Sequence, residues 1–364
     1  MRSPDASLTG DDGFLETEDR GLTYPWGART PEVGELIAIA DGIGWVRIPM
    51  PGSLGHINCW VIDDAPSGAL TIVDSGICLP DCRAAWEALF AGPLEGRKVA
   101  RLIATHMHPD HIGLMGWLAE RDGAPLHMTR QEWLTAKFVI ADVQEAVPAA
   151  VLDFRRAAGW TEEQVAESAK EGWGRLRHVI HHMPHGYVRM EEGEILPLGD
   201  GQSWRVVVGS GHSPEHACLY NEAANILISG DQILPKISSN VSLGASEPMA
   251  NPLGDWLASI DKLLGVLPED VLVLPAHGEP FRGAHERLKA LKAEHLERLD
   301  ALVVHCAEAP RTAVDCFAIL FNRVIGDSHR GLATGEALAH LRYLEVAGRV
   351  TSAMRDGVTW WQVA

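Results

Sequence analysis

The sequence has little basic charge and no long apolar run. Lys and Arg number 31 against 49 Asp and Glu, which gives a formal net charge of −18. This excess of negative charge disfavours general binding to polyanions such as nucleic acid, because the long-range field repels them. No apolar run is long enough to cross a membrane. We therefore expect neither nucleic acid nor a membrane among the partners of this protein.

The sequence also lacks a secretory signal pattern and a cysteine framework. Residues 1–30 are rich in acidic side chains, with no basic start followed by an apolar core. We interpret this segment as a flexible arm or one that clasps a partner. The 6 cysteines are scattered and form no CxxC pair, so reduced thiols and a cytoplasmic setting are expected.

The chain has enough residues, 364, for a large core and two domains, and its regular elements can be placed from hydrophobic periodicity. Short strands separated by Pro and Gly turns are typical of a half-buried sheet. The pattern predicts strands at 37–39, 44–48, 56–62, 69–73 and 99–104, and helices at 81–90, 112–121, 255–267 and 283–304.

A dense group of potential metal ligands follows the apolar run 99–104. His106, His108, Asp110 and His111 place three histidines and one aspartate within six positions. Pro109 is expected to stop any regular element, so these side chains should lie on a loop past a strand end. Imidazole and carboxylate are the usual ligands of a borderline divalent ion such as zinc. The alternative is a polar loop that contains histidines by chance, and the density of ligands argues against it.

Three further strand-like runs end in the same way. His212 follows 204–208, Asp231 follows 225–228, and His277 follows 271–274. Each residue alone is a weak signal, because a His or Asp after a strand is more often a turn residue or a satisfied core group. The repetition of one arrangement is the stronger evidence.

Taken in order, these motifs resemble the ligand motifs of the metallo-β-lactamase-fold hydrolases over roughly residues 35–290. The matching stretches are His106-x-His108-x-Asp110-His111, Gly211-His212-Ser213-Pro214, Gly230-Asp231 and Ala276-His277-Gly278.

The resemblance implies an α/β fold, a four-layer αββα sandwich, and a site for two divalent metal ions. Zinc is the expected metal, with iron and manganese as alternatives. An aspartate at the bridging position resembles the glyoxalase II and lactonase branch rather than the β-lactamases, which usually carry cysteine there. The resemblance assigns His106, His108 and His212 to the first metal, Asp110, His111 and His277 to the second, and Asp231 to a bridge between them.

The same resemblance divides the chain into the arm, a catalytic domain at 31–297 and a small domain at 298–364. A mostly helical insertion, about 128–185, is expected either to cap the site and shape the substrate pocket or to form a dimer contact. Helices at 313–325 and from Thr334, then a hairpin around Asp356-Gly357, resemble a winged-helix tail. From 301 to 364 six Arg balance six acidic residues, so we read this tail as a structural or dimer-contacting module rather than a DNA reader.

Several other polar residues have two interpretations each. Asp74 follows a predicted strand and either orients a metal-binding histidine or is an ordinary turn residue. His56 either lines the pocket mouth or forms a structural hydrogen bond. His216 is a further candidate that we expect to hydrogen-bond within the ligand loop. The group His178, His181, His182 and His185 forms either an extra metal site or acid–base relay, or a His-rich segment without a defined role.

These features together predict a dinuclear metal-dependent hydrolase of a small ester, thioester or lactone. Two dications lower the pKa of a shared water, which provides a bridging hydroxide for attack on the carbonyl. Asp110 is expected to take or give a proton as well as to bind metal. The alternatives are a phosphodiesterase or ribonuclease, a non-catalytic regulatory protein on the same fold, and an oxygen-handling redox enzyme. The expected partner is a small-molecule substrate, and the arm and tail leave room for a homodimer.

Overall fold

The computed structural model describes residues 16–64, 67–199, 201–321 and 323–364. Its first sheet is mixed, with antiparallel pairing from β3 to β6 and parallel pairing from β6 to β9. The predicted strands in this region are confirmed. The seven strands run in spatial order: β3 (Ile37–Ala40), β4 (Ile43–Pro49), β5 (His56–Asp64), β6 (Ala69–Val73), β7 (Val99–Ile103), β8 (Leu126–Thr129) and β9 (Val188–Met190).

The second sheet is antiparallel except at one edge, where β13 and β14 run parallel. Parallel neighbours end at the same edge of a sheet, so the loops after β13 and β14 emerge side by side. The five strands run in spatial order: β10 (Ile195–Leu198), β11 (Gln202–Gly209), β12 (His216–Asn221), β13 (Ile226–Gly230) and β14 (Leu272–Pro275).

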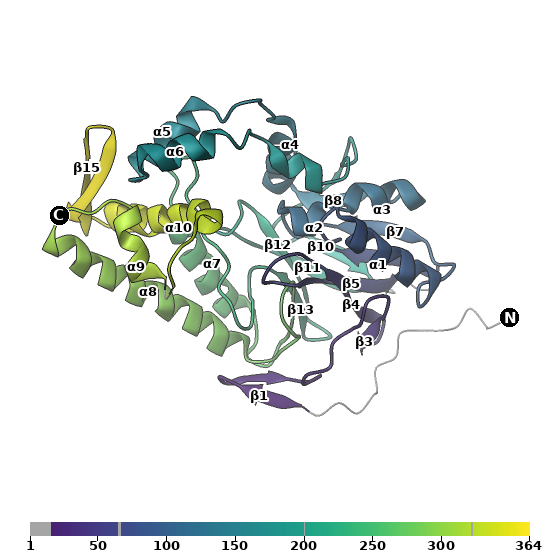
Figure 1. The fold of residues 1–364 in the computed structure, drawn as a ribbon. Helices are drawn as coiled ribbons and strands as arrows, with labels where there is room; N and C mark the ends of the chain where they lie inside the picture. Colours follow the sequence, from purple (N-terminus) through teal and green to yellow (C-terminus); the bar gives the residue numbers. More distant parts are fainter. Residues whose placement is uncertain (1–15, 65–66, 200, 322) are drawn as a thin grey trace.

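The sheets pack face to face and helices cover both outer faces, as Figure 1 shows. Alternation along β5 explains this layering, because successive strand residues point to opposite faces. Ile57, Cys59 and Val61 pack in the cluster that contains α1, whereas Trp60 and Ile62 pack in the cluster between the two sheets. The predicted four-layer αββα sandwich is confirmed. The outer helices are α1 (Pro80–Ala91) and α3 (Met115–Asp122) on one side, and α7 (Pro252–Val266) and α8 (Ala284–Glu308) on the other.

The insertion between β8 and β9 is mainly helical, as predicted, and it reaches the C-terminal region. Figure 1 shows its helices crossing from the β8 end of the first sheet toward the C-terminal hairpin. The Trp160 indole N–H donates a hydrogen bond to Thr334 Oγ1 at 2.9 Å, and Trp160 is buried in the same cluster as the C-terminal helices. The insertion contains α4 (Arg130–Ala141), α5 (Ala149–Ala157), α6 (Glu162–Ala169) and the 3₁₀ helix η1 (Arg175–Val179).

The C-terminal region contains two differences from the sequence prediction. The expected helix 313–325 is replaced by the 3₁₀ helix η2 (Val314–Cys316) and α9 (Phe317–Leu320), and the chain is extended at Phe321. The β-branched pair at 324–325 and Gly326 disfavour a longer helix. The next helix, α10 (Asp327–Val346), begins seven residues before Thr334. The predicted hairpin is confirmed as β15 (Val350–Arg355) and β16 (Val358–Val363).

The predicted flexible arm is wrong for residues 16–30. A hairpin of β1 (Thr17–Asp19) and β2 (Leu22–Tyr24) lies there, and Leu22 and Tyr24 are buried in the core that contains α8. The backbone of Thr23 also exchanges hydrogen bonds with that of Arg282. Burial of two large apolar side chains stabilises this segment. The remainder of the expected arm, 1–15, lies outside the described residues.

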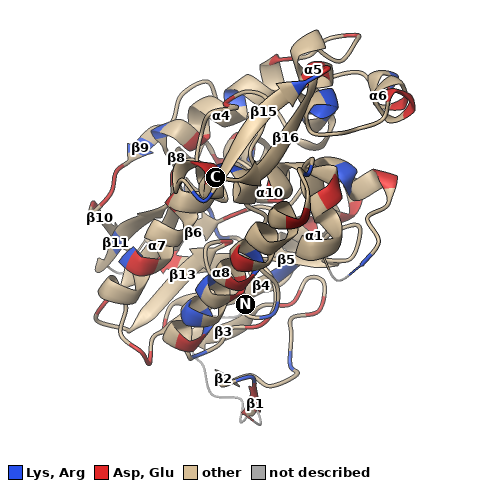
Figure 2. Ribbon diagram, turned by 90° about the vertical axis from the view of Figure 1, so that its left-hand side faces the viewer, with Lys and Arg blue, Asp and Glu red and all other residues tan. Residues whose placement is uncertain are grey.

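Three further observations concern the cysteines, the helices and the charged side chains. All six cysteines are free. Within the described residues, no helix combines the length and the apolar character needed to cross a membrane. Acidic and basic side chains both lie along α8, as Figure 2 shows.

Candidate metal centre

The ligand-rich stretch leaves the carboxyl end of β7 and divides into a loop and a short helix. His106 and His108 lie on the loop, whereas Asp110 and His111 lie in the one-turn helix α2 (Pro109–Ile112). The prediction that all four side chains lie on a loop is therefore wrong for Asp110 and His111. Proline occupies the first helical position, where no backbone N–H is needed and its fixed φ suits the helix. This turn separates the two pairs of side chains.

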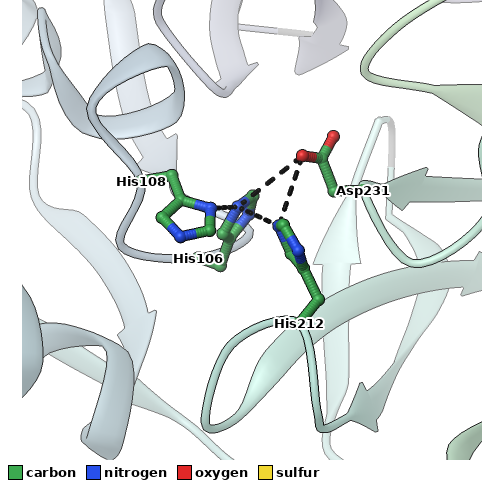
Figure 3. Close-up of side chains that lie close together, drawn as sticks. All are labelled: His106, His108, His212 and Asp231. Atoms are coloured by element: carbon green, nitrogen blue, oxygen red, sulfur yellow. Dashed lines mark hydrogen bonds and ion pairs between the residues drawn. The ribbon is translucent and has the colours of Figure 1, made fainter. Parts of the chain in front are cut away.

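One group of potential ligands contains His106, His108, His212 and Asp231, whose donor atoms all lie within 4.8 Å of one another. Figure 3 shows the four side chains converging, with His106 and His108 on one loop and His212 and Asp231 on two others. His106 Nε2 lies 2.8 Å from His108 Nδ1 and 3.2 Å from His212 Nε2. Asp231 Oδ2 lies 3.3 Å from His212 Nε2. Three imidazole nitrogens and one carboxylate oxygen thus face a common point.

The second group contains Asp110, His111 and His277, and Asp231 adjoins it as well. Asp110 Oδ2 lies 3.3 Å from His277 Nε2 and 3.5 Å from His111 Nε2. Asp231 Oδ2 lies 3.6 Å from His111 Nε2, and its Oδ1 lies 3.6 Å from His277 Nε2. The Asp231 carboxylate therefore contacts both groups, and all seven residues singled out in the sequence meet at one place.

The donor atoms fit bound divalent ions. His111 Nε2 and Asp231 Oδ1 are buried and have no hydrogen-bond partner among the described residues. Such orphaned atoms are costly unless something else pairs with them. Burial, reinforced by neighbouring imidazoles, lowers the pKa of His106 well below its ordinary range and that of His108 to about 3. Both rings are therefore neutral, which is the form that binds a metal.

The carboxylates give the second group a strong attraction for positive charge. Burial alone would lower the pKa of His111, but Asp74, Asp110 and Asp231 outweigh burial and raise it well above its ordinary range. A buried position that draws a proton so strongly also favours a divalent cation, which would satisfy the same carboxylates.

Three of the histidines are fixed through the ring nitrogen that faces away from the site. The Nδ1 atom of His111 lies 2.8 Å from Asp74 Oδ2, that of His212 lies 2.7 Å from the Asn240 carbonyl, and that of His277 lies 2.9 Å from the His56 carbonyl. Each acceptor holds a proton on Nδ1 and leaves Nε2 free to bind an ion. The contact of Asp74 with His111 agrees with the orienting interpretation of this residue.

His56 has the structural role. Burial lowers its pKa to about 4, so the ring is neutral, and its Nε2 accepts a hydrogen bond from the Gly278 N–H at 3.2 Å. His216 lies on β12 and is fully buried. Its Nε2 accepts a hydrogen bond from the Asp231 N–H at 3.0 Å, and its ring stacks on His106 with centroids 4.7 Å apart. His216 thus positions two ligand residues and is not itself a ligand.

A buried glutamate that sequence reasoning missed ties two ligand loops together. Glu132 on α4 accepts from the Met107 N–H at 2.9 Å through Oε2. Its Oε1 accepts from Ser213 Oγ at 2.6 Å and from the Glu215 N–H at 2.7 Å. Met107 lies between His106 and His108, and Ser213 follows His212. No sequence signal distinguishes Glu132 from the other acidic residues of this helical segment.

Asn58 plays the corresponding part at the loop that carries His277. Its Nδ2 donates to the Pro275 and Gly278 carbonyls at 2.8 Å, and its Oδ1 accepts from the Trp45 indole N–H at 2.8 Å. Asn58 is fully buried. Because Asn58 lies in the first sheet and the His277 loop follows the second, this amide joins the two sheets beside the site.

The histidine group at 178–185 does not join the centre. Among the described residues, only the two groups above bring together three or more potential ligands. His181 lies 3.7 Å from Glu120, and the His181 and His182 rings are 6.2 Å apart. The alternative of an additional metal site in this segment is therefore wrong.

A cavity of about 560 Å³ opens directly onto the ligands. None of its described lining residues comes from 128–185, so the expectation that the insertion shapes the pocket is wrong. The C-terminal region takes that place, because the short α9 lets the chain turn back toward the ligands. We name this side of the cavity the C-terminal wall, formed by Phe321, Arg323, Ile325, His329, Leu332, Ala333 and Glu336.

Comparison with known proteins agrees with this geometry over most of the chain. The family model of the metallo-beta-lactamase superfamily matches residues 52–277, and a model of a metallo-beta-lactamase-like C-terminal domain matches 299–364. A probable metallo-hydrolase of Bacillus subtilis is 23% identical over 87% of this chain and 96% of its own. A human acyl-coenzyme A thioesterase is 24% identical over 72% of this chain and 86% of its own.

Solved structures extend the similarity to the whole architecture. A beta-lactamase domain protein from Burkholderia ambifaria superposes with a TM-score of 0.87 at 38% identity, covering 94% of this chain and 98% of its own. A metallo-beta-lactamase family protein from Thermus thermophilus superposes with a TM-score of 0.74 at 28% identity, covering 89% and 99%. On the motifs, the fold and these matches, the chain belongs to the metallo-beta-lactamase superfamily.

Proposed function

We propose that this protein is a dinuclear metal-dependent hydrolase that cleaves a small ester, thioester or lactone. The observation that carries the proposal is the position of Asp231, whose carboxylate lies 3.3 Å from His212 in one ligand group and 3.6 Å from His277 in the other. A carboxylate shared between two ligand groups is suited to hold two ions close together. Zinc is the metal we expect, and a site rich in histidine also accepts iron or manganese.

In the proposed reaction the ligand residues would hold two metal ions, and the ions would activate the carbonyl and the water. Two divalent ions at this centre would supply Lewis acidity, which polarises a carbonyl and makes a water acidic near neutral pH. His106, His108 and His212 would hold one ion, Asp110, His111 and His277 the other, and Asp231 both. In the reaction a water oxygen bonds to the carbonyl carbon and the bond to the leaving oxygen or sulfur breaks. An ester or thioester yields a carboxylate, a proton and an alcohol or thiol, whereas a lactone yields a single hydroxycarboxylate and a proton.

Asp110 is the residue we assign to proton transfer as well as to binding. Its Oδ2 contacts His277 at 3.3 Å, and it also lines the cavity, so the same carboxylate faces both the ligands and an incoming substrate. From this place Asp110 would accept the proton that the attacking water loses and return it to the leaving group.

Relatives of known or inferred activity support hydrolysis as the reaction class. The human relative is named for thioester hydrolysis of acyl-coenzyme A, and the Bacillus subtilis relative is a probable metallo-hydrolase. Thioesters, esters and lactones share an electrophilic carbonyl and an oxygen or sulfur leaving group, so one centre serves all three bonds. The fold alone does not fix a function, and the ligand set is what supports this one.

The test measures metal content and turnover together for the wild type and Asp231→Ala. Protein purified without chelator should contain about two metals per chain and hydrolyse an ester, a thioester or a lactone. Asp231→Ala should lose metal and activity, whereas Asp153→Ala, an exposed aspartate on α5, should match the wild type. Cleavage of a dinucleotide phosphodiester instead of a carbonyl substrate would identify a nuclease. A wild type without metal, or an active Asp231→Ala variant, would overturn the proposal.

A further inference from the structure

Apolar side chains that line the cavity beside the metal centre remain exposed to solvent. Ile237 is 43% exposed and Leu332 is 58% exposed, although both line the cavity. Large apolar side chains gathered at the mouth of a concave site are typical of ligand contact rather than of chain packing. The large apolar side chains of the lining are Met50, Leu54, Leu234, Ile237, Phe321, Ile325 and Leu332, and Pro109 and Ala333 complete the apolar set.

The charged lining residues differ in whether they already have partners. Asp110 and Asp231 belong to the metal centre. Glu336 accepts a hydrogen bond from Asn240 Nδ2 at 3.2 Å and lies 3.9 Å from Arg298. Arg323 is the only Lys or Arg among the described lining residues, and it takes part in none of the hydrogen bonds or ion pairs between described residues.

Arg323 thus presents to the cavity a positive charge without a partner among the described residues, in a chain of net charge −18. A guanidinium offers a planar set of donors that matches a carboxylate or phosphate. The cavity therefore combines an apolar surface, a carbonyl-activating centre at one end and an anion-binding side chain on the C-terminal wall.

We propose that the cavity selects acyl esters or thioesters that carry both an apolar chain and an anionic group. The chain lies against Ile237 and Leu332, the anionic group pairs with Arg323, and the scissile carbonyl faces the ligand groups. The inference rests on the proposed function for the bond that is cleaved, but the recognition by Arg323 is independent of it. The cavity volume of about 560 Å³ is in the range of small-molecule sites, about 300–1,000 Å³.

The experiment compares two esters that differ only in a terminal charge. p-Nitrophenyl hexanoate is neutral, and the mono-p-nitrophenyl ester of adipic acid adds a carboxylate at the far end of the same chain. The wild type should have the higher kcat/KM for the adipate ester. Arg323→Gln should lower the ratio of the two kcat/KM values about tenfold, mainly through KM of the adipate ester. Arg355→Gln, on the C-terminal hairpin and outside the cavity lining, should leave the ratio unchanged.

Binding of a non-hydrolysable analogue separates this inference from the proposed function. The monoanilide of adipic acid should bind the wild type about tenfold more tightly than Arg323→Gln in calorimetry. If the wild type cleaves neither ester but shows this difference, the recognition stands and the hydrolase proposal falls. If both esters are cleaved with equal kcat/KM and Arg323→Gln behaves as the wild type in both assays, the recognition is overturned and the hydrolase proposal stands.

Discussion

The ligand loops and the C-terminal wall face each other across one cavity, but they are built from different kinds of sequence. Each ligand loop follows an apolar strand and carries its functional side chain within a few residues of the strand end. The wall depends on where α9 stops, where α10 starts, and how both pack against distant segments. Local sequence therefore specifies the reactive groups, whereas long-range packing specifies what the cavity accepts.

The two regions are nevertheless joined by one residue. The backbone carbonyl of Asn240 lies 2.7 Å from Nδ1 of His212. The side-chain Nδ2 of the same residue donates to Glu336 on the C-terminal wall at 3.2 Å. A hydrogen bond from the Leu243 N–H to the Gly335 carbonyl at 2.9 Å continues this contact. The segment after Asn240 thus fixes the distance between a metal-facing histidine and α10.

The largest expected effect comes from removing the glutamate that joins two ligand loops. Glu132→Ala leaves the Met107 N–H, the Glu215 N–H and the Ser213 hydroxyl without their buried acceptor. The loops carrying His106, His108 and His212 then lose a shared anchor. We expect metal affinity at this group to fall about 100-fold, as for other residues that orient ligands.

Competition with a chromophoric chelator measures that affinity directly, and Glu167→Ala, an exposed glutamate on α6, is the matched control. Glu132→Gln keeps the side-chain volume but places an amide among the three donors, so it should lie between the wild type and Glu132→Ala. Wild-type affinity in Glu132→Ala would mean that the ligand loops hold their geometry without help from α4.

A second effect concerns the loss of stability in acid at the contact between α8 and α10, the helix that carries part of the C-terminal wall. His295 on α8 and His340 on α10 are both buried, and His295 Nδ1 lies 3.1 Å from His340 Nε2. The other ring nitrogen of His340, Nδ1, donates to the Glu336 carbonyl at 2.8 Å. Burial lowers the pKa of His295 to about 3 and that of His340 to about 4. Arg298 nearby opposes protonation of both rings. Both pKa values lie below the unfolded value of about 6.5.

Because the folded protein binds these protons less readily than the unfolded chain, stability is complete above pH 6.5 and falls as the pH drops toward 4. At pH 5 the loss is about 2 kcal/mol for each histidine. Urea unfolding of the wild type at pH 7.5 and pH 5 measures the total change. The double variant His295→Gln/His340→Gln should show a smaller difference between the two pH values. An equal difference would show that this pair does not titrate on unfolding.

The third effect isolates the orientation of a single histidine. Asp74→Asn keeps the shape of the side chain but removes the charge that holds the proton on His111 Nδ1. The second metal should bind about tenfold more weakly, while the first group is affected less. Titration of metal-free protein with zinc resolves the two sites, and Asp81→Asn, on the first turn of α1, is the control. The backbone N–H and the hydroxyl of Thr105, the residue before His106, also donate to Asp74, each at 2.9 Å. Equal weakening of both sites would indicate that Asp74 supports the whole centre through Thr105 instead.

The ligand groups were predictable because each ligand motif follows a strand and has a recognisable residue pattern, although Asp110 and His111 lie in the short helix α2. Asp74 was also identified, since it follows β6 in the same way. Glu132 and Asn58 were not, because a buried polar group is defined by donors from distant segments and no local pattern marks them. The hairpin at 17–24 was missed for a related reason: tertiary contacts outweigh local propensity in short elements. The early end of α9 was missed although the β-branched pair at 324–325 and Gly326 already disfavour a longer helix.

The smallest expected effect tests the apolar part of the wall. Leu332 is 58% exposed and lines the cavity, so truncation removes contact with a ligand and little packing within the protein. Leu332→Ala should lower the ratio of kcat/KM for p-nitrophenyl hexanoate to that for the acetate ester by about threefold, since only the longer chain reaches this side chain. Leu296→Ala, 42% exposed on α8 and outside the cavity lining, should leave the ratio as in the wild type. If the two variants give the same ratio, the C-terminal wall does not contact the acyl chain, and chain-length selection must come from the loops around Met50 and Leu234.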